Sequence, residues 1–122
     1  MKNHILIILS LIFSVNILFA QKTMIFSDSY KNYRDAQELF DKSKYSAAQN
    51  KFSLVINEIT NAQDELRVDA EFYHAVCALE LFHLDAEILL KRFVLDHPDH
   101  PKSKKVFFQL VRHNYRIKKF NK

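Results

Sequence analysis

The stretch that decides the fold runs from Asp69 to Pro98 and reads DAEFYHAVCALELFHLDAEILLKRFVLDHP. It holds two segments with apolar residues at helical spacing, separated by a short turn near His83. Proline lacks the backbone N–H that a continuing helix needs, so Pro98 indicates where the second helix ends. The stretch therefore predicts a helix, a turn and a second helix that pack together as a hairpin.

The same pattern recurs along the chain. Residues of one unit have counterparts 38 positions later, namely Tyr45 and His83, Ala48 and Ala86, Phe52 and Leu90, and Val55 and Phe93, and Phe120 lies 37 positions after His83. Two-helix units that repeat at roughly 34 to 40 residues are typical of α-solenoids, in which each unit buries its apolar side against the next. The expected fold is all-α, an α-solenoid of antiparallel helix hairpins with about two and a half repeats.

The spacing of apolar residues predicts five helices, over residues 30–42, 46–59, 66–82, 84–96 and 102–117. These give repeat 1 at 30–60, repeat 2 at 66–98 and a partial repeat 3 at 102–122. Thr60 or Asn61 is expected to cap the third helix. That helix carries a wide apolar stripe, and we expect it to be buried on two sides. The stripe consists of Ala70, Phe72, Tyr73, Val76, Cys77, Leu79 and Leu81.

Specific packing roles follow from the alignment of the repeats. The small side chains of Ala48 and Ala86 allow two helices to approach closely, and Tyr45 and His83 are expected to pack at the helix–helix corners. Phe52 and Leu90 are expected to fill the space between helices. In the chain as given, the last helix has no following helix, so Val106, Phe107, Leu110 and Val111 are expected to remain uncovered. We therefore expect the N-terminal part of a longer repeat protein, with capping by further repeats, by a second copy or by a partner as alternatives.

The first 20 residues have the features of a signal peptide. Lys2 is followed by a nearly unbroken apolar run from Ile5 to Phe19, and Ala20 is a small residue suited to cleavage. The run is shorter than a membrane span usually requires. An uncleaved membrane anchor is the alternative. Residues 21–29 are expected to form a lead-in segment, and the protein is expected to be periplasmic or associated with the outer membrane.

Composition excludes several classes of site. The chain has no Gly, which argues against the glycine-rich loops that hold phosphates and dinucleotides. The single Cys77 cannot form an internal disulfide. His97, Asp99 and His100 have chemistry suited to zinc or copper, but they fall in a turn between repeats, where these residue types are common. We expect no enzyme activity, no cofactor and no metal site.

The charge is uneven along the chain. Residues 21–99 carry 9 Lys/Arg and 14 Asp/Glu, whereas residues 100–122 carry 8 Lys/Arg and no acidic residue. The basic end has two interpretations: a surface for anionic lipid or nucleic acid, or the solvated face of one helix. Its charges interleave with apolar residues of the core type, which favours the second interpretation, and nucleic acid is not expected as a partner.

Part of this pattern resembles a known family. Tyr45-x-x-Ala48-x-x-x-Phe52-x-x-Val55 is similar to the second-helix motif of the tetratricopeptide repeat (TPR) family, and Ala86 and Pro98 match it in the next unit. The family's early Trp and its first-helix Gly are absent here. With the leader, the pattern looks most like exported bacterial members such as the outer-membrane assembly lipoprotein and the Tol–Pal coordinator protein.

The resemblance implies a scaffold that mediates protein–protein interaction in the cell envelope. In TPR proteins the first helices of the repeats line a concave groove. The positions that this assigns to the groove are Tyr30, Tyr33, Gln37, Phe40, Glu71, Ala78, Lys105, Phe108, Arg112 and Arg116. The alternative is an envelope-binding module that uses the basic C-terminal helix on anionic lipid or peptidoglycan.

Overall fold

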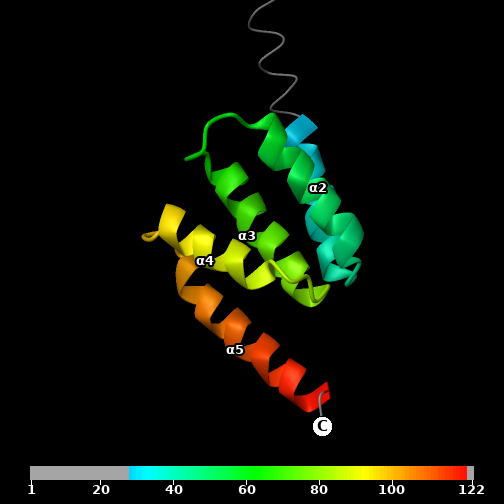
Figure 1. Ribbon diagram of the computed structural model, residues 1–122. Helices are drawn as coiled ribbons and strands as arrows, with labels where there is room; N and C mark the ends of the chain where they lie inside the picture. Colours follow the sequence, from blue (N-terminus) through cyan, green and yellow to red (C-terminus); the bar gives the residue numbers. More distant parts are fainter. Residues whose placement is uncertain (1–27, 121–122) are drawn as a thin grey trace, which may run out of the picture.

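The computed structural model describes residues 28–120, and the side chains of residues 28–119. This part of the chain is all-α and has five helices: residues 28–41, α2 (Tyr45–Glu58), α3 (Glu65–Glu80), α4 (Ala86–Asp96) and α5 (Ser103–Phe120), shown in Figure 1. The predicted signal peptide lies outside the described residues, as does the lead-in segment up to residue 27. Residues 28 and 29 already belong to the first helix.

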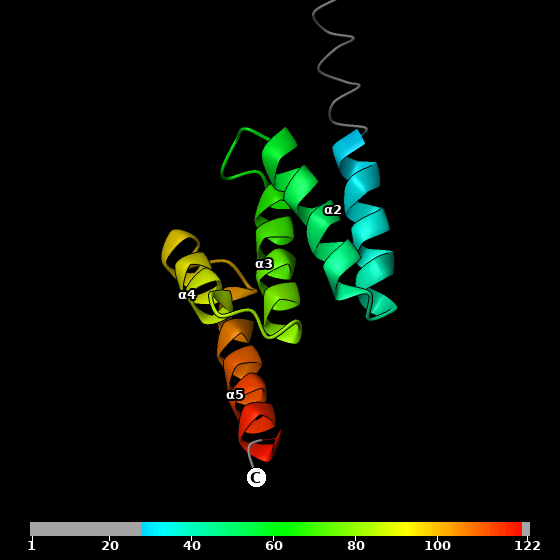
Figure 2. The ribbon, with the colours of Figure 1, turned by 45° about the vertical axis from the view of Figure 1, so that its right-hand side comes forward.

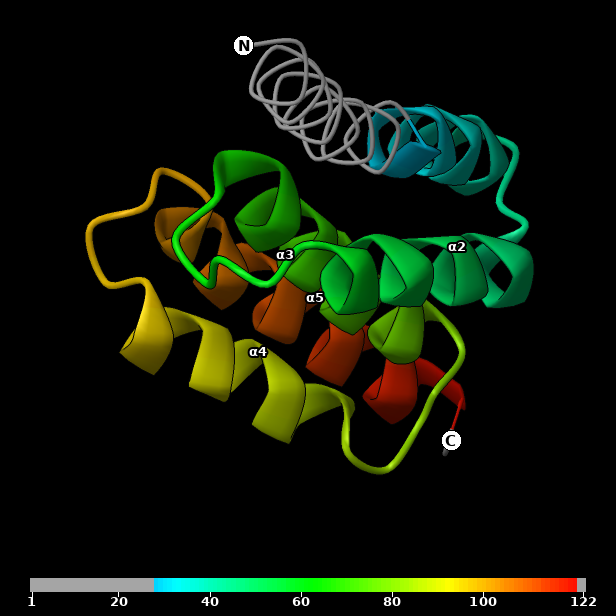
Figure 3. The ribbon, with the colours of Figure 1, turned by 90° about the horizontal axis from the view of Figure 1, so that it is seen from above.

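The helices pack in chain order. The first helix joins α2 through the buried Ser29, whose hydroxyl donates to Glu58 Oε2 at 2.8 Å. Beyond this hairpin, α2 contacts α3, α3 contacts α4, and α4 contacts α5. In addition, α3 contacts α5 directly. The first helix and α4 therefore lie on opposite sides of α3, as Figures 2 and 3 show.

Two apolar clusters form the core, and α3 contributes to both. One cluster joins the first helix, α2 and α3, and consists of Ala36, Ala48, Phe52, Val55, Ile59, Ala70 and Cys77. The other joins α3, α4 and α5, and consists of Val68, Phe72, Ala75, Val76, Ala78, Leu79, Ala86, Leu90, Phe93 and Val106. The prediction that α3 is buried on two sides is confirmed.

Of the residues predicted to pack the repeats, some are buried as expected and others are exposed. Ala48, Phe52, Ala86 and Leu90 are almost completely buried, as expected for side chains between close helices. Tyr45 is half-buried and lies edge-on to Phe40, with ring centroids 5.4 Å apart. His83 does not pack at its corner, and it is exposed in the turn between α3 and α4, as is Pro98 in the turn that follows α4.

The exposure of His83 follows from how α3 ends. The prediction ran this helix to residue 82, but it ends at Glu80 and α4 begins only at Ala86. Phe82 adopts a left-handed backbone conformation with φ of 57°, and the His83 N–H then donates back to the Ala78 carbonyl at 2.9 Å. This is a Schellman motif, which terminates the helix and turns the next residue toward solvent.

The turn between the first helix and α2 ends its helix in the same way, with a residue in the left-handed conformation. Ser43 also has φ of 57°, and the Lys44 N–H donates to the Leu39 carbonyl at 2.8 Å. Glycine is the residue that adopts this conformation most easily, and a chain without glycine must place other residues there. The two hairpin turns are therefore built alike although their sequences differ.

The predicted cap of α3 was wrong. Neither Thr60 nor Asn61 caps the helix. Asp64 does so, and its carboxylate accepts from the backbone N–H groups of Leu66 and Arg67. Asn61 instead accepts from the Gln63 N–H at 3.1 Å, which forms a turn before the helix. This turn lies within the connection from α2 to α3, which spans residues 59–64.

Candidate functional site

One candidate site is the surface where the first helix, α3 and α5 lie next to one another, which we call the inner face. Tyr33 on the first helix donates its phenolic O–H to Asp69 Oδ2 on α3 at 3.2 Å. Lys102, just before α5, forms an ion pair with the same carboxylate. Asp69 on α3 therefore joins a side chain of the first helix to one at the start of α5.

A second carboxylate joins α3 to α5 further along the inner face. Glu80 accepts from Arg112 through one oxygen and from Arg116 through the other. Its side chain is only 10% exposed, so it is largely desolvated against these two cations. The guanidinium of Arg116 also lies over the Phe82 ring, 5.0 Å from its centroid. These contacts fix the position of α5 relative to α3.

Sequence reasoning missed Asp69, Glu80 and Lys102 as residues of this surface. A signal was present, because Asp69, Tyr73 and Glu80 are spaced by four and seven residues and so share one face of a helix. Lys102 also contacts that face, with its ammonium 4.8 Å from the centroid of the Tyr73 ring. The charged residues that organise the inner face were thus readable from the spacing on α3.

The predicted groove residues differ in how exposed they are in the structure. Tyr30, Phe108, Lys105 and Arg112 are exposed, and Tyr33, Gln37, Phe40 and Arg116 are partly buried. Phe40 lies edge-on to Tyr73, with centroids 5.2 Å apart, and contributes to the core more than to a surface. Two pockets flank Asp69: one of about 370 Å³ is lined by Tyr30, and one of about 500 Å³ is lined by Lys105.

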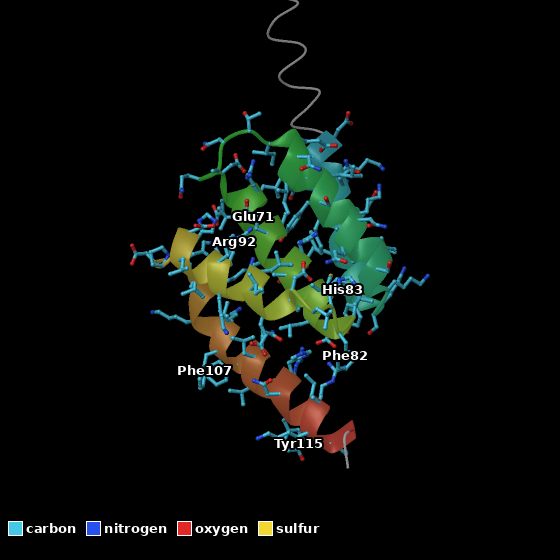
Figure 4. The ribbon with its side chains drawn as sticks, viewed as in Figure 1. Glu71, Phe82, His83, Arg92, Phe107 and Tyr115 are labelled. Carbon is cyan, nitrogen blue, oxygen red and sulfur yellow. The ribbon has the colours of Figure 1, made fainter. Side chains whose placement is uncertain are left out.

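Glu71 and Ala78 lie apart from the other predicted groove residues. Ala78 is completely buried in the core. Glu71 accepts from Arg67 Nε at 3.0 Å and lies 3.0 Å from His97 Nε2. It also lines a pocket beside α4 together with Arg92, and Figure 4 shows both side chains. Glu71 lies on a different side of α3 from Asp69 and Tyr73. It faces α4, whereas Asp69 and Tyr73 face the inner face.

The tyrosines of the inner face remain protonated donors. Burial raises the pKa of Tyr33 well above its usual range, and the nearby charge of Asp69 raises it further. Burial also raises the pKa of Tyr73, with Asp69 as the next cause. Tyr33 therefore keeps its phenolic proton, which it donates to Asp69.

The histidines of the turn after α4 serve different carboxylates. His97 is buried and lies against Glu71, whereas His100 Nε2 lies 3.7 Å from Asp69 Oδ1. The His97 carbonyl accepts from the Ser103 hydroxyl at 2.6 Å, which fixes the start of α5. Asp99 is exposed. Among residues 28–120, no group of three His, Cys, Asp or Glu side chains is arranged to hold a metal ion.

A second candidate site is the outer surface of the last two helices, which we call the end face. It consists of Ile88 and Leu95 on α4 and Phe107, Leu110 and Val111 on α5. An apolar groove of about 400 Å³ lies between these helices. Of the residues expected to remain uncovered, Phe107 and Val111 are exposed and Leu110 is half-buried. Val106 is the exception, because it is only 3% exposed and belongs to the core.

Cys77 lies inside the first core cluster. Its thiol is completely buried, and burial, followed by the charge of Glu80, raises its pKa to about 12. The thiolate is the reactive form of cysteine, so a buried thiol with a raised pKa is unreactive.

We expect Cys77 in the folded protein not to react with Ellman's reagent at pH 8 during an hour, and to react within minutes in 6 M guanidinium chloride. The matched control is a Cys77→Ala, Ala47→Cys variant, since Ala47 is exposed on α2. That cysteine should react at once in the folded state. Rapid modification of native Cys77 would show that the packing of α3 opens on this timescale.

Comparison with protein-family models, with curated proteins and with solved structures finds no match for this chain. No family is identified in this way. In the part of the chain that the structure describes, no helix has both the length and the apolar character needed to cross a bilayer.

Proposed function

We propose that the protein is a TPR-like α-solenoid scaffold that binds other proteins. The observation that carries this proposal is the distribution of exposed apolar side chains. Of the ten large hydrophobic residues exposed within residues 28–119, seven follow residue 83: Leu84, Ile88, Leu95, Phe107, Phe108, Val111 and Tyr115. Apolar surface concentrated in one region is typical of protein interaction sites.

The repeat arrangement has three supports. Each helix packs on the next, and α3 also contacts α5, as expected when the first helices of successive units adjoin. The first helix reaches α3 in the same way, through Tyr33 and Asp69. Ala48 and Ala86, which are equivalent in the two units, are both buried. These features favour stacking of hairpins over an unrelated helical bundle.

We place this scaffold in the cell envelope because of the sequence of residues 1–20. A positively charged start, a short apolar run and a small residue at its end are typical of proteins that are exported. The scaffold is then periplasmic or associated with the outer membrane, and the partners that it binds are proteins of that compartment.

Site-specific photo-crosslinking tests the proposal. A photoreactive phenylalanine analogue replaces Tyr30, Phe108 or, on the end face, Phe107 in the full chain, produced in the cells that normally make it. We expect discrete crosslinked products with other proteins in the envelope fraction, because all three side chains are exposed. The control position is Leu54, which is exposed on α2, away from the inner face and the end face. The absence of protein adducts from every position on both faces would contradict the proposal.

The basic surface of α5 favours a second candidate function, binding to an anionic surface such as lipid or peptidoglycan. This helix has six Lys or Arg residues and no acidic residue. Arg112 and Arg116 pair with Glu80, whereas Lys104, Lys105, Lys118 and Lys119 form no ion pair among the described residues. Cosedimentation with anionic vesicles that weakens strongly between 20 and 150 mM salt would favour this function.

A further inference from the structure

We propose that the end face docks an amphipathic helix of a partner protein whose apolar stripe is flanked by Asp or Glu residues. This inference rests on the proposed function, since it names the surface and the kind of partner for protein binding. Three features of the end face support it: the shape of the groove, the spacing of the side chains along it, and the charge around it.

The groove between α4 and α5 is open and apolar. Its walls include Val94 and Leu95 on α4 and Phe107 and Leu110 on α5, and only Lys91 and Ser103 bring polar groups to it. Leu95 is 80% exposed and Phe107 is 68% exposed. Figure 4 shows Phe107 on the outer side of α5, away from the first helix and α2. Covering these two side chains removes apolar area from water, which favours docking.

The spacing of the exposed side chains suits a helix. Ile88, Lys91 and Leu95 are spaced by three and four residues and form a ridge on α4. Phe107 and Val111 are spaced by four residues and form the ridge on α5, and Leu110 lines the groove beside it. A third helix can lay its own row of side chains between two such ridges. An extended peptide would gain less, because α-helices have no free backbone groups to pair with a strand.

Charge selects the kind of helix. Lys104 and Lys118 lie on the exposed side of α5 near Phe107 and Val111 in the helical wheel, and neither forms an ion pair among the described residues. Lys91 pairs only with the exposed Glu87, at 3.4 Å. A partner with Asp or Glu beside its apolar stripe gains attraction at this rim, whereas one with Lys or Arg is repelled.

The charge of the end face disfavours one other occupant, and its shape disfavours a second. A second copy docked symmetrically by the end face would bring Lys104 and Lys118 of both copies together. A bilayer surface offers anionic headgroups, but it is smooth on the scale of a groove between two ridges and leaves the groove unfilled. A partner helix satisfies both the apolar groove and the cationic rim.

The test uses synthetic helical peptides with one Leu stripe at spacings of three and four residues. One peptide has Glu on both sides of the stripe, one has Lys there, and one is a scramble of the Glu peptide. Binding to the full chain is measured by fluorescence anisotropy. We expect the Glu peptide to bind at least tenfold more tightly than the other two. Leu95→Asp and Phe107→Asp should each weaken its binding at least tenfold, and Leu54→Asp on α2 should not.

Several outcomes would overturn the inference. The first is equal binding of the Lys or scrambled peptide. The second is binding to anionic vesicles with no binding to the peptides, which identifies a membrane surface. The third is a dimer in light scattering that Phe107→Asp dissociates, which identifies a second copy. Circular dichroism checks that each variant folds, and Val111→Asp replaces any variant that does not.

The failure of this inference is distinguishable from the failure of the proposed function. Protein adducts from a photoreactive residue at position 30 that persist in the Phe107→Asp variant would preserve the function and exclude the end face as its site. Equal binding of the Glu, Lys and scrambled peptides, with adducts retained, has the same meaning. Only the absence of adducts from both faces would contradict the function itself.

Discussion

Replacement of Phe52 by alanine is expected to lower the free energy of unfolding by about 3 to 5 kcal/mol. Phe52 is completely buried on α2 and joins three helices. Its ring stacks on Tyr73 of α3, with centroids 5.5 Å apart, and lies edge-on to Tyr33 of the first helix at 5.8 Å. The substitution removes both ring contacts and leaves a cavity that the surrounding helices fill only in part.

Urea unfolding followed by circular dichroism at 222 nm measures this loss, since the chain has no tryptophan. A domain of this size has a total stability of roughly 5 to 15 kcal/mol, so this loss is a large share of the total. Leu54→Ala is the matched control, two residues along the same helix and 46% exposed. It should cost less than about 1 kcal/mol. Equal losses in the two variants would contradict the assignment of Phe52 to the core.

The buried side of each helix was predictable because burial follows a simple period. Alanine and large apolar residues at steps of three and four identify the side of a helix that packs, whatever lies opposite. Ala48 and Phe52, and then Ala86 and Leu90, were found in this way and are buried. The order of the helices followed from the short connections between them.

The turns, and the directions in which polar residues of the helices face, were harder to predict from the sequence. No sequence signal marks Phe82 as a left-handed residue, because glycine normally has this role and the chain has none. The groove prediction for α3 depended on an alignment, and each residue along an α-helix turns the side chain by about 100°. An error of two positions is enough to choose Glu71 in place of Asp69 or Tyr73.

An aromatic residue at helical spacing can be packed in the core or exposed on the surface, and the local sequence does not distinguish these two environments. Phe40 and Phe108 were both assigned to a groove. Phe40 packs between Tyr45 and Tyr73, while Phe108 is exposed. The difference arises because α2 and α3 both reach the first helix, whereas no described helix covers that side of α5. Whether such a residue is buried depends on which helices pack against it, and the local sequence pattern does not contain that information.

The second large effect is expected for Asp69→Ala, which should lower the free energy of unfolding by about 2 to 4 kcal/mol. The Asp69 side chain is 25% exposed, and its carboxylate has three partners among the described residues: Tyr33, His100 and Lys102. The side chain of Lys102 is only 14% exposed, and the substitution leaves its ammonium without this carboxylate. Glu87→Ala is the control, because it breaks an exposed ion pair with Lys91, which contributes at most about 0.5 kcal/mol.

A double-mutant cycle separates the ion pair from the other contacts of Asp69. If Asp69 and Lys102 interact directly, the losses of Asp69→Ala and Lys102→Ala should fall short of additivity by about 1 to 3 kcal/mol. Hydrogen exchange gives a second measurement, since Lys102 leads into α5 and its anchor is lost. Amides of α5 should lose protection before those of α2 in the Asp69→Ala variant. Additive losses, or an unchanged order of exchange, would show that Glu80 with Arg112 and Arg116 holds α5 in place without Asp69.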